Sequence, residues 1–166
     1  EGFDDLRCHL SFPFLININN QLFMIPESSE RKEVLLFQSV EFPARWKKIK
    51  VLLSDTEVTD NIFLSINETC YLLSTTMDNK IIIHSAEHLH GQWQRITPTL
   101  KVSNHHHRGA GTPYLVDNKM YFLTQECTPE TYGKSIYIKE LVTLNDINFD
   151  ENLIEQINSS INHSDG

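Results

Sequence analysis

The feature that most constrains the fold of this 166-residue chain is a pattern that occurs three times. Each copy has a short apolar run, a polar turn with Asn or Asp, and a second apolar run that carries an aromatic residue. The copies lie at 13–25, 62–73 and 113–123. The first run of each copy also has an aromatic residue, and these residues, Phe14, Phe63 and Tyr114, are spaced 49 and 51 positions apart. Two short apolar runs around such a turn indicate a β-hairpin. The chain is therefore predicted to contain three related hairpins.

Further β-rich runs follow each hairpin and give each copy four predicted strands. Third strands are predicted at 33–37, 80–83 and 135–138, and fourth strands at 46–52, 93–96 and 141–144. Trp46 and Trp93 open the fourth run in two copies, whereas the third copy has Leu141. Four short strands that recur about every 40–50 residues are typical of β-propeller blades. We predict an all-β fold of antiparallel meanders with blades at about 11–55, 59–101 and 107–150. The alternative is a β-sandwich made of hairpins.

The two ends of the chain carry weaker signals. Natural propellers have roughly four to eight blades, so three blades predict an incomplete propeller, an open arc or part of an assembly. Residues 1–10 are predicted to supply an outer strand of an earlier blade. Residues 151–166 read as a polar tail, and the stretch 150–161 has the pattern of a short helix.

Composition limits the classes of partner. The formal net charge of −8 disfavours nucleic acid and anionic membrane surfaces. No stretch approaches the roughly 20 apolar residues that a membrane span needs, so no membrane insertion is expected. The three cysteines lack metal-ligand spacing, and their odd number fits a reducing compartment such as the cytoplasm. Localisation is otherwise left open.

Polar side chains gather at the predicted ends of the inner strands, where the loops of a propeller mouth would meet. Glu27, Asp60 and Glu126 come from three different copies, and three carboxylates at one mouth suit sugar hydroxyls. Two of them suit glycoside cleavage by an acid and a base or nucleophile. The side chains expected to bind substrate are His9, Arg108 and Gln125. The alternative is that each carboxylate caps a turn or pairs with a nearby basic side chain.

No metal or other cofactor is expected. His105, His106 and His107 are adjacent, and three consecutive side chains in a strand or loop point in different directions rather than at one ion. Cys127 has no evident base beside it in the sequence, so it is interpreted as a structural thiol.

Several short motifs carry a resemblance to a known family. They are 11–14 (SFPF), 23–28 (FMIPES), 60–63 (DNIF), 108–111 (RGAG), 125–128 (QECT) and 132–133 (YG). Together they resemble the N-terminal propeller domain of plant glucosamine inositolphosphorylceramide transferases and related domains in formyltransferase-linked bacterial proteins. The resemblance covers roughly residues 9–141. It implies a sugar-nucleotide, glycolipid or polysaccharide context, with transfer chemistry in a separate C-terminal domain.

The same family is similar to the five-bladed propellers of arabinanase, xylosidase and levansucrase-type glycosidases. In those enzymes an acidic residue commonly stands at the head of a blade's first strand, and Asp60 matches that place. The other two copies depart from the pattern, with Ser11 or Phe12 and with Gly111 or Thr112.

Three functions follow as hypotheses. The first is a carbohydrate-binding, glycosidase-like propeller domain in a protein that synthesises or modifies glycans or glycolipids, with further domains of the same protein as partners. The second is an active glycoside hydrolase or glycosyl-transferring enzyme, which two carboxyl groups about 5–10 Å apart across an open channel would favour. The third is a structural scaffold, which carboxylates tied to basic side chains would favour.

Overall fold

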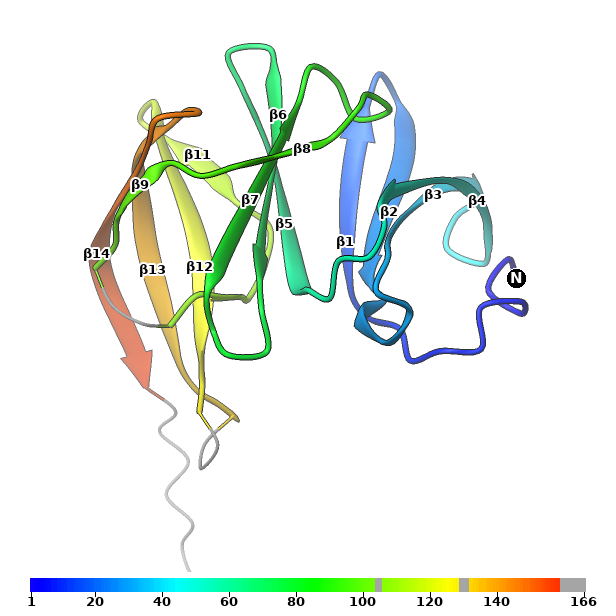
Figure 1. The fold of residues 1–166 in the computed structure, drawn as a ribbon, viewed down its shortest axis with the longest axis horizontal. Coiled ribbons are helices and arrows are strands. Elements are labelled where there is room, and N and C mark those ends of the chain that lie inside the picture. Colours follow the sequence, from blue (N-terminus) through cyan, green and yellow to red (C-terminus); the bar gives the residue numbers. More distant parts are fainter. Residues whose placement is uncertain (104–105, 129–131, 159–166) are drawn as a thin grey trace, which may run out of the picture.

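A computed structural model describes residues 1–103, 106–128 and 132–158 as three β-sheets that stand side by side (Figure 1). The first sheet contains β1 (Ser11–Ile18), β2 (Gln21–Glu27), β3 (Val34–Glu41) and β4 (Arg45–Leu53). The second contains β5 (Thr59–Ile66), β6 (Thr69–Thr75), β7 (Ile81–Ala86) and β8 (Gln94–Ile96). The third contains β9 (Thr99–Lys101), β10 (Arg108–Gly109), β11 (Tyr114–Val116), β12 (Lys119–Cys127), β13 (Tyr132–Leu144) and β14 (Asn148–Asn158). A 3-10 turn, η1 (Ser29–Arg31), is the helical element in the described part.

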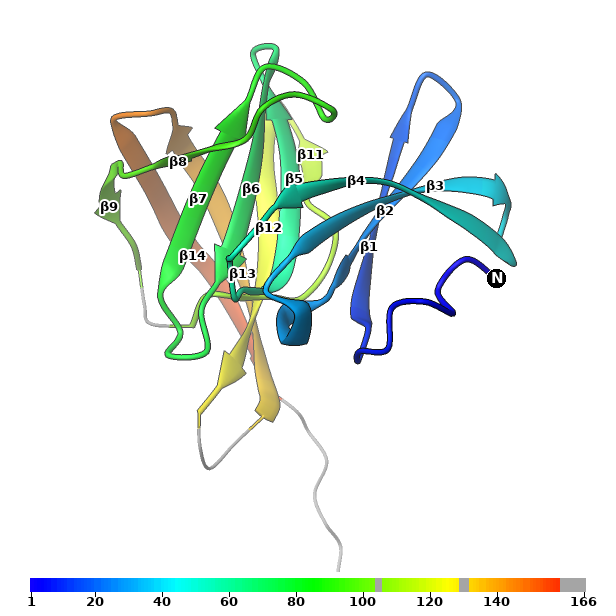
Figure 2. The same cartoon turned by 45° about the vertical axis from the view of Figure 1, so that its right-hand side comes forward.

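The first two sheets are simple antiparallel meanders in sequence order, as expected for propeller blades (Figure 2). The third sheet has the order β10-β12-β13-β14-β9, with β11 also paired to β12. The all-β, blade-like fold predicted from the repeat is therefore confirmed. Within the described ranges, no helix has the length and apolar character that a membrane crossing requires.

Three hairpin turns give the repeat its register. Both central residues of each turn have positive φ, which is the backbone of the type I′ turn that fits the twist of a hairpin. The three turns are Asn19-Asn20, Asn67-Glu68 and Asp117-Asn118, with φ between 48° and 66°. Asn and Asp adopt this conformation more readily than most residues, which explains their recurrence at these places.

The strand pairing corrects how the three copies of the repeat are matched to one another. Phe14 pairs with Ile25 and Ile62 pairs with Leu73, so Phe14 corresponds to Ile62 rather than to Phe63. The turns, rather than the aromatic residues, mark the equivalent points. The same register makes Glu27, Thr75 and Gln125 equivalent positions in the three blades.

The third blade differs from its prediction in three ways. Residues 141–144, expected as the fourth strand, continue β13, and β14 supplies the fourth strand. The helix expected from residue 150 is wrong up to Asn158, because Phe149 and Glu151 are buried between more exposed neighbours in the two-residue period of a strand. Residues 159–161 lie outside the described part. In addition, β9 leaves the second blade and pairs in parallel with β14, so residues 99–101 belong to the third sheet.

The N-terminal segment, expected as a strand of an earlier blade, contains no strand and covers the first blade instead. Leu6 is buried with Met24, Leu35, Phe37 and Trp46. The ring of Phe3 lies 5.1 Å from that of Phe37. This small cluster is separate from the main core, which fills the space between the blades.

Candidate functional site

One basic side chain joins acidic side chains of the other two blades. Arg108 lies in β10 of the third blade, Glu27 ends β2 of the first, and Asp60 lies near the start of β5 of the second. The Arg108 Nε donates a hydrogen bond to Asp60 Oδ2, and Arg108 Nη2 lies 3.7 Å from Glu27 Oε2. The Asp60 backbone N–H also faces Glu27 Oε2 at 3.4 Å. Three of the residues predicted for the site therefore meet.

Local backbone features bring these groups together. A bulge between Thr59 and Ile62 interrupts the β5–β6 pairing, and Asp60 within it has a φ of 47°. Gly109, next to Arg108, lies against this bulge: a Cβ atom there would be 2.7 Å from the Asp60 carbonyl oxygen. The missing side chain of Gly109 thus lets the second and third blades approach closely enough for the Arg108–Asp60 bond.

Three further residues complete the surroundings of Arg108 and were not among the residues predicted for the site. Arg108 Nη1 lies 3.4 Å from Cys127 Sγ, and the guanidinium carbon lies 5.3 Å from the centre of the Tyr132 ring. Ser29 Oγ donates to Glu27 Oε1 at 3.1 Å. Cys127 and Tyr132 stand in the very motifs that carry the family resemblance, so those motifs were the signal that could have found them.

Burial governs the electrostatics of this cluster. Glu27 is 8% exposed and Asp60 is 3% exposed. The pKa of Asp60 is raised to about 6: burial raises it most, the hydrogen bond and charge of Arg108 oppose the rise, and neighbouring Glu27 adds to it. Burial alone would lower the pKa of Arg108, but bonding to Asp60 and Cys127 raises it above its ordinary value. Arg108 therefore keeps its charge and stabilises the ionised forms of its partners.

The other predicted residues are arranged differently. Gln125 pairs with Arg108 across β10 and β12, and its Nε2 donates to the Gly109 carbonyl oxygen at 3.2 Å. Glu126 is the next residue along β12 and lies where the β12–β13 pairing is irregular, between Gln125 and Cys127. Its described partner there is Tyr137, whose pKa is raised by burial and then by the charge of Glu126. His9 is exposed, and its backbone N–H donates to Glu30 Oε2.

The pairing of both acids with Arg108 limits the reactions that the cluster can catalyse. A glycoside hydrolase of the usual kind needs one carboxyl group to move a proton and another to activate water or attack the sugar. Glu27 and Asp60 instead share one guanidinium and are both buried. Hydrogen-bonding groups remain accessible at Tyr132, which is 68% exposed, and at the partly exposed Gln125.

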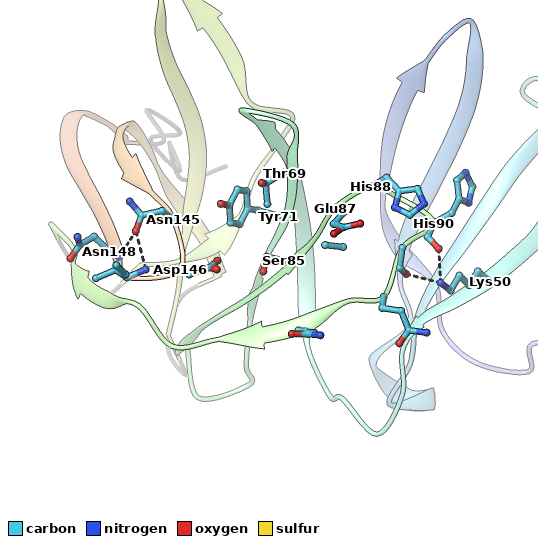
Figure 3. A pocket seen from close by; sticks show the side chains of 15 residues that line it. Lys50, Thr69, Tyr71, Ser85, Glu87, His88, His90, Asn145, Asp146 and Asn148 are labelled. Atoms are coloured by element: carbon cyan, nitrogen blue, oxygen red, sulfur yellow. Dashed lines mark hydrogen bonds between the residues drawn. The ribbon is translucent and has the colours of Figure 1, made fainter.

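A polar groove of about 980 Å³ lies at the opposite, turn end of the blades (Figure 3). Tyr71 and Ser85 of the second blade, the 87–92 loop and the β13–β14 turn line it, and Lys50 closes it on the first blade. Lys50 Nζ donates to the carbonyl oxygens of His90 and Gly91, both at 2.6 Å. None of the predicted site residues lines this groove.

Residues 1–103, 106–128 and 132–158 contain no group of three or more His, Cys, Asp or Glu side chains arranged to hold a metal ion. His105 of the triple histidine lies outside these ranges. Among its neighbours, His106 stacks on Tyr137 with ring centres 4.8 Å apart.

The fold is that of a glycosidase-like propeller. The chain aligns with an exo-β-1,3-galactanase from Phanerochaete chrysosporium in complex with galactose, with a TM-score of 0.69 and 10% identity, over 92% of this chain and 39% of that one. It also aligns with a thermostable family-43 glycoside hydrolase, with a TM-score of 0.66 and 14% identity, over 91% of this chain and 54% of that one. These likenesses concern the fold alone.

The chain belongs to the family described as glucosamine inositolphosphorylceramide transferase 1, N-terminal, whose model matches residues 4–165. It is 29% identical over 149 residues to the glucosamine inositolphosphorylceramide transferase 1 of Arabidopsis thaliana. It is 25% identical over 152 residues to the protein of that name from Oryza sativa subsp. japonica. In both cases 84% of this chain is covered, and the chain spans only 19–20% of the relative's length.

Proposed function

We propose that this domain binds a sugar-containing ligand at the Arg108 cluster without cleaving it, within a protein that synthesises or modifies glycans or glycolipids. The observation that carries the proposal is the sharing of Arg108 by Glu27 and Asp60. This arrangement occupies the acids that hydrolysis would use, yet it leaves Tyr132 and Gln125 at the edge of the cluster.

The side chains around Arg108 suit a neutral, hydroxyl-rich ligand. The guanidinium is balanced by two carboxylates, so the cluster offers no net positive charge to a free anion. The exposed Tyr132 ring presents a flat apolar face, and such a face fits the C–H side of a sugar ring. Gln125 and the Tyr132 hydroxyl supply hydrogen-bonding groups, and a few well-placed polar groups beside an aromatic ring are typical of small-molecule sites.

The family and the structural neighbours support a sugar ligand. The relatives are named for the transfer of glucosamine to inositolphosphorylceramide, and one galactanase structure contains β-1,3-galactotriose. Because this chain spans about a fifth of those relatives, the transfer reaction itself is assigned in this proposal to another part of the protein.

Binding and turnover can be tested together with glucosamine, galactose and β-1,3-galactotriose. We expect binding by calorimetry or by amide chemical shifts, with no release of reducing sugar. Tyr132→Ala should weaken binding by about tenfold or more, the loss of an aromatic anchor. Tyr114→Ala, a change at another partly exposed tyrosine, is the matched control and should bind normally.

Each alternative has its own result. Release of reducing sugar that Asp60→Asn abolishes would make the domain an enzyme and overturn the non-cleaving role. If the domain binds none of the three sugars, the Arg108 cluster would have the structural role of holding the three blades together. If Tyr132→Ala binds sugar as tightly as the wild type, the binding site does not lie at the Arg108 cluster.

A further inference from the structure

The polar groove at the turn end of the blades, which we call the turn-end groove, lies where two equivalent loops differ in length (Figure 3). Residues 87–93 join β7 to β8, whereas only residues 145–147 join β13 to β14. The longer loop places His90 edge-on to Phe23 of the first blade, with ring centres 5.2 Å apart. Tyr71 occupies the place of Phe23 in the second blade. The short turn of the third blade does not cover Tyr71 in the same way, and the groove lies there instead.

The second blade contributes hydroxyl and amide groups to one wall of the groove. Tyr71, Ser85 and Gln94 lie side by side across β6, β7 and β8. Thr69 shares their face because it stands two positions from Tyr71 along β6. Burial raises the pKa of the Tyr71 hydroxyl, the charge of Asp146 raises it further, and a hydrogen bond with Thr69 opposes the rise. Tyr71 therefore keeps its proton at neutral pH and can donate it in a hydrogen bond.

Two carboxylates line the groove on either side of Tyr71 in the view of Figure 3, Glu87 of the second blade and Asp146 of the third. Both residues are exposed. Neither forms an ion pair with a side chain of the described residues. The carboxylates of the Arg108 cluster, by contrast, are buried and paired. The acids of the turn-end groove can therefore accept hydrogen bonds from a ligand.

The basic side chains of the groove do not balance these acids. Among the described residues that line it, Lys50 is the lysine, and there is no arginine. Lys50 Nζ donates to the carbonyl oxygens of His90 and Gly91, both at 2.6 Å, so its charge is held at one end of the groove. A phosphate or carboxylate group would meet two unpaired acids there. This charge pattern favours a ligand that brings hydrogen-bond donors over one that brings negative charge.

Local hydrogen bonds fix both walls of the groove. Asn145 Oδ1 accepts hydrogen bonds from the backbone N–H groups of Ile147 and Asn148, at 2.9 and 2.8 Å. On the other wall the Gly91 N–H donates to the His88 carbonyl oxygen at 2.8 Å. Walls that are ordered in advance lose little conformational entropy when a ligand binds.

We propose that the turn-end groove binds a neutral oligosaccharide, as a second site separate from the Arg108 cluster. Sugar hydroxyls both donate and accept hydrogen bonds, and the groove offers carboxylates as acceptors beside hydroxyl and amide groups. A small cation would use the carboxylates alone. The volume of about 980 Å³ lies at the upper end of the roughly 300–1,000 Å³ of small-molecule pockets, so more than one sugar ring fits. None of these residues belongs to the Arg108 cluster, so the proposal does not rest on the function proposed above.

Amide chemical shifts of the isotope-labelled chain, titrated with β-1,3-galactotriose and with xylotriose, locate the site and give its affinity. We expect shift changes at residues 69–71, 85–88 and 145–148. Asp146→Asn and Glu87→Gln keep the side-chain shape, and each should weaken binding at the groove by about tenfold, the loss of a charged hydrogen-bond acceptor. Asp55→Asn is the matched control, because Asp55 is also exposed and its positive φ suits Asn. It should bind as the wild type does.

The shift map separates this proposal from the function proposed for the Arg108 cluster. Changes confined to the Arg108 cluster would overturn the groove site and leave the other site standing, whereas changes confined to the groove would do the reverse. Tyr132→Ala should leave binding at the groove unchanged. Equal affinity of wild type and both acid variants would overturn the proposal. Tighter binding of spermidine than of either sugar would also overturn it, by identifying a cation site.

Discussion

The two interfaces between the blades are built from different chemistry. Between the first and second blades the core is apolar, with Phe23, Ile25 and Leu36 fully or almost fully buried. Between the second and third blades the core includes a buried ion pair, in which Lys139 Nζ lies 2.8 Å from Glu151 Oε1 with both side chains 0% exposed. One repeated backbone therefore accommodates two kinds of interior.

A single repeated position carries a different buried side chain in each blade. Phe37, His84 and Lys139 occupy equivalent places in the third strands of the first two blades and in β13 of the third. Burial, with a smaller contribution from Arg95, lowers the pKa of His84 to about 4, so this histidine is neutral at physiological pH. Burial also lowers the pKa of Lys139, and Glu151 opposes that shift. The surroundings satisfy these side chains to different degrees: Lys139 is paired with Glu151, whereas the Nδ1 atom of His84 is buried without a hydrogen-bond partner.

The largest effect is expected from removing one partner of the ion pair. Lys139→Met should destabilise the protein by about 3–5 kcal/mol, because the Glu151 carboxylate would remain buried without its counter-charge. The double variant Lys139→Met/Glu151→Met should recover most of the loss. Urea unfolding gives both values, and Lys119→Met, which breaks an exposed pair with Glu140, is the control that should leave the midpoint nearly unchanged. Equal losses in the single and double variants would contradict this account.

A smaller effect is expected from two equivalent truncations. They compare a fully buried position of the first blade with a partly buried position of the third. Ile25→Ala should cost about 2–4 kcal/mol, because it opens a cavity in the apolar interface. Leu123→Ala, at the corresponding place in the third blade, should cost clearly less, since that side chain is only partly buried. Thermal unfolding of the two variants measures the difference, and similar losses would mean that Leu123 is packed as tightly as Ile25.

The next effect depends on pH and concerns the cluster that joins all three blades. The pKa of Asp60 is about 6 in the folded protein against an ordinary 3.8, so the folded state binds more protons between these values. Stability contributed by this group is present below pH 3.8 and is lost as the pH rises through 6, at most about 3 kcal/mol. Asp60→Asn should flatten that part of the stability curve. Parallel curves for wild type and variant would refute the assignment.

The smallest effect should come from the polar tether between the first two blades. Lys50→Met removes two hydrogen bonds to the 90–91 backbone from a half-buried side chain and should cost about 1 kcal/mol. Lys47→Met, on the same strand and exposed, is a suitable control. A loss as large as that of Ile25→Ala would mean that the first interface is not mainly apolar.

Sequence reasoning recovered the fold where local chemistry repeats. The Asn and Asp turns and the apolar runs around them fix two blades and most of the third. It failed where the third blade departs from the repeat, since β14 is exposed after Glu151 and mixes polar residues with Leu153, Ile154 and Ile157, a spacing that also suits a helix. It also could not foresee β9, because a three-residue strand that pairs with another blade has no local signature.

The candidate site was recovered in part. Glu27, Asp60 and Arg108 were found because strand ends of successive blades meet at one mouth. Glu126 interacts with Tyr137, whereas Gln125 and Cys127 lie beside Arg108; a role of Glu126 in binding stays a prediction. The ion pairing itself depends on a bulge and on the close approach at Gly109, which are properties of the packed blades.

The parallel pairing of β9 with β14 has a mechanical consequence. Thr99, Leu100 and Lys101 pair with Asn148, Phe149 and Asp150, and the whole third blade lies between them in the sequence. If the described chain were stretched from its two ends, tension would reach β9 at its N-terminal end and β14 at its C-terminal end. The two strands would then be loaded in shear, so all of their bonds would resist together. The β9–β14 pairing would therefore bear the load first, and the strands between β9 and β14 would come under tension only after that pairing breaks.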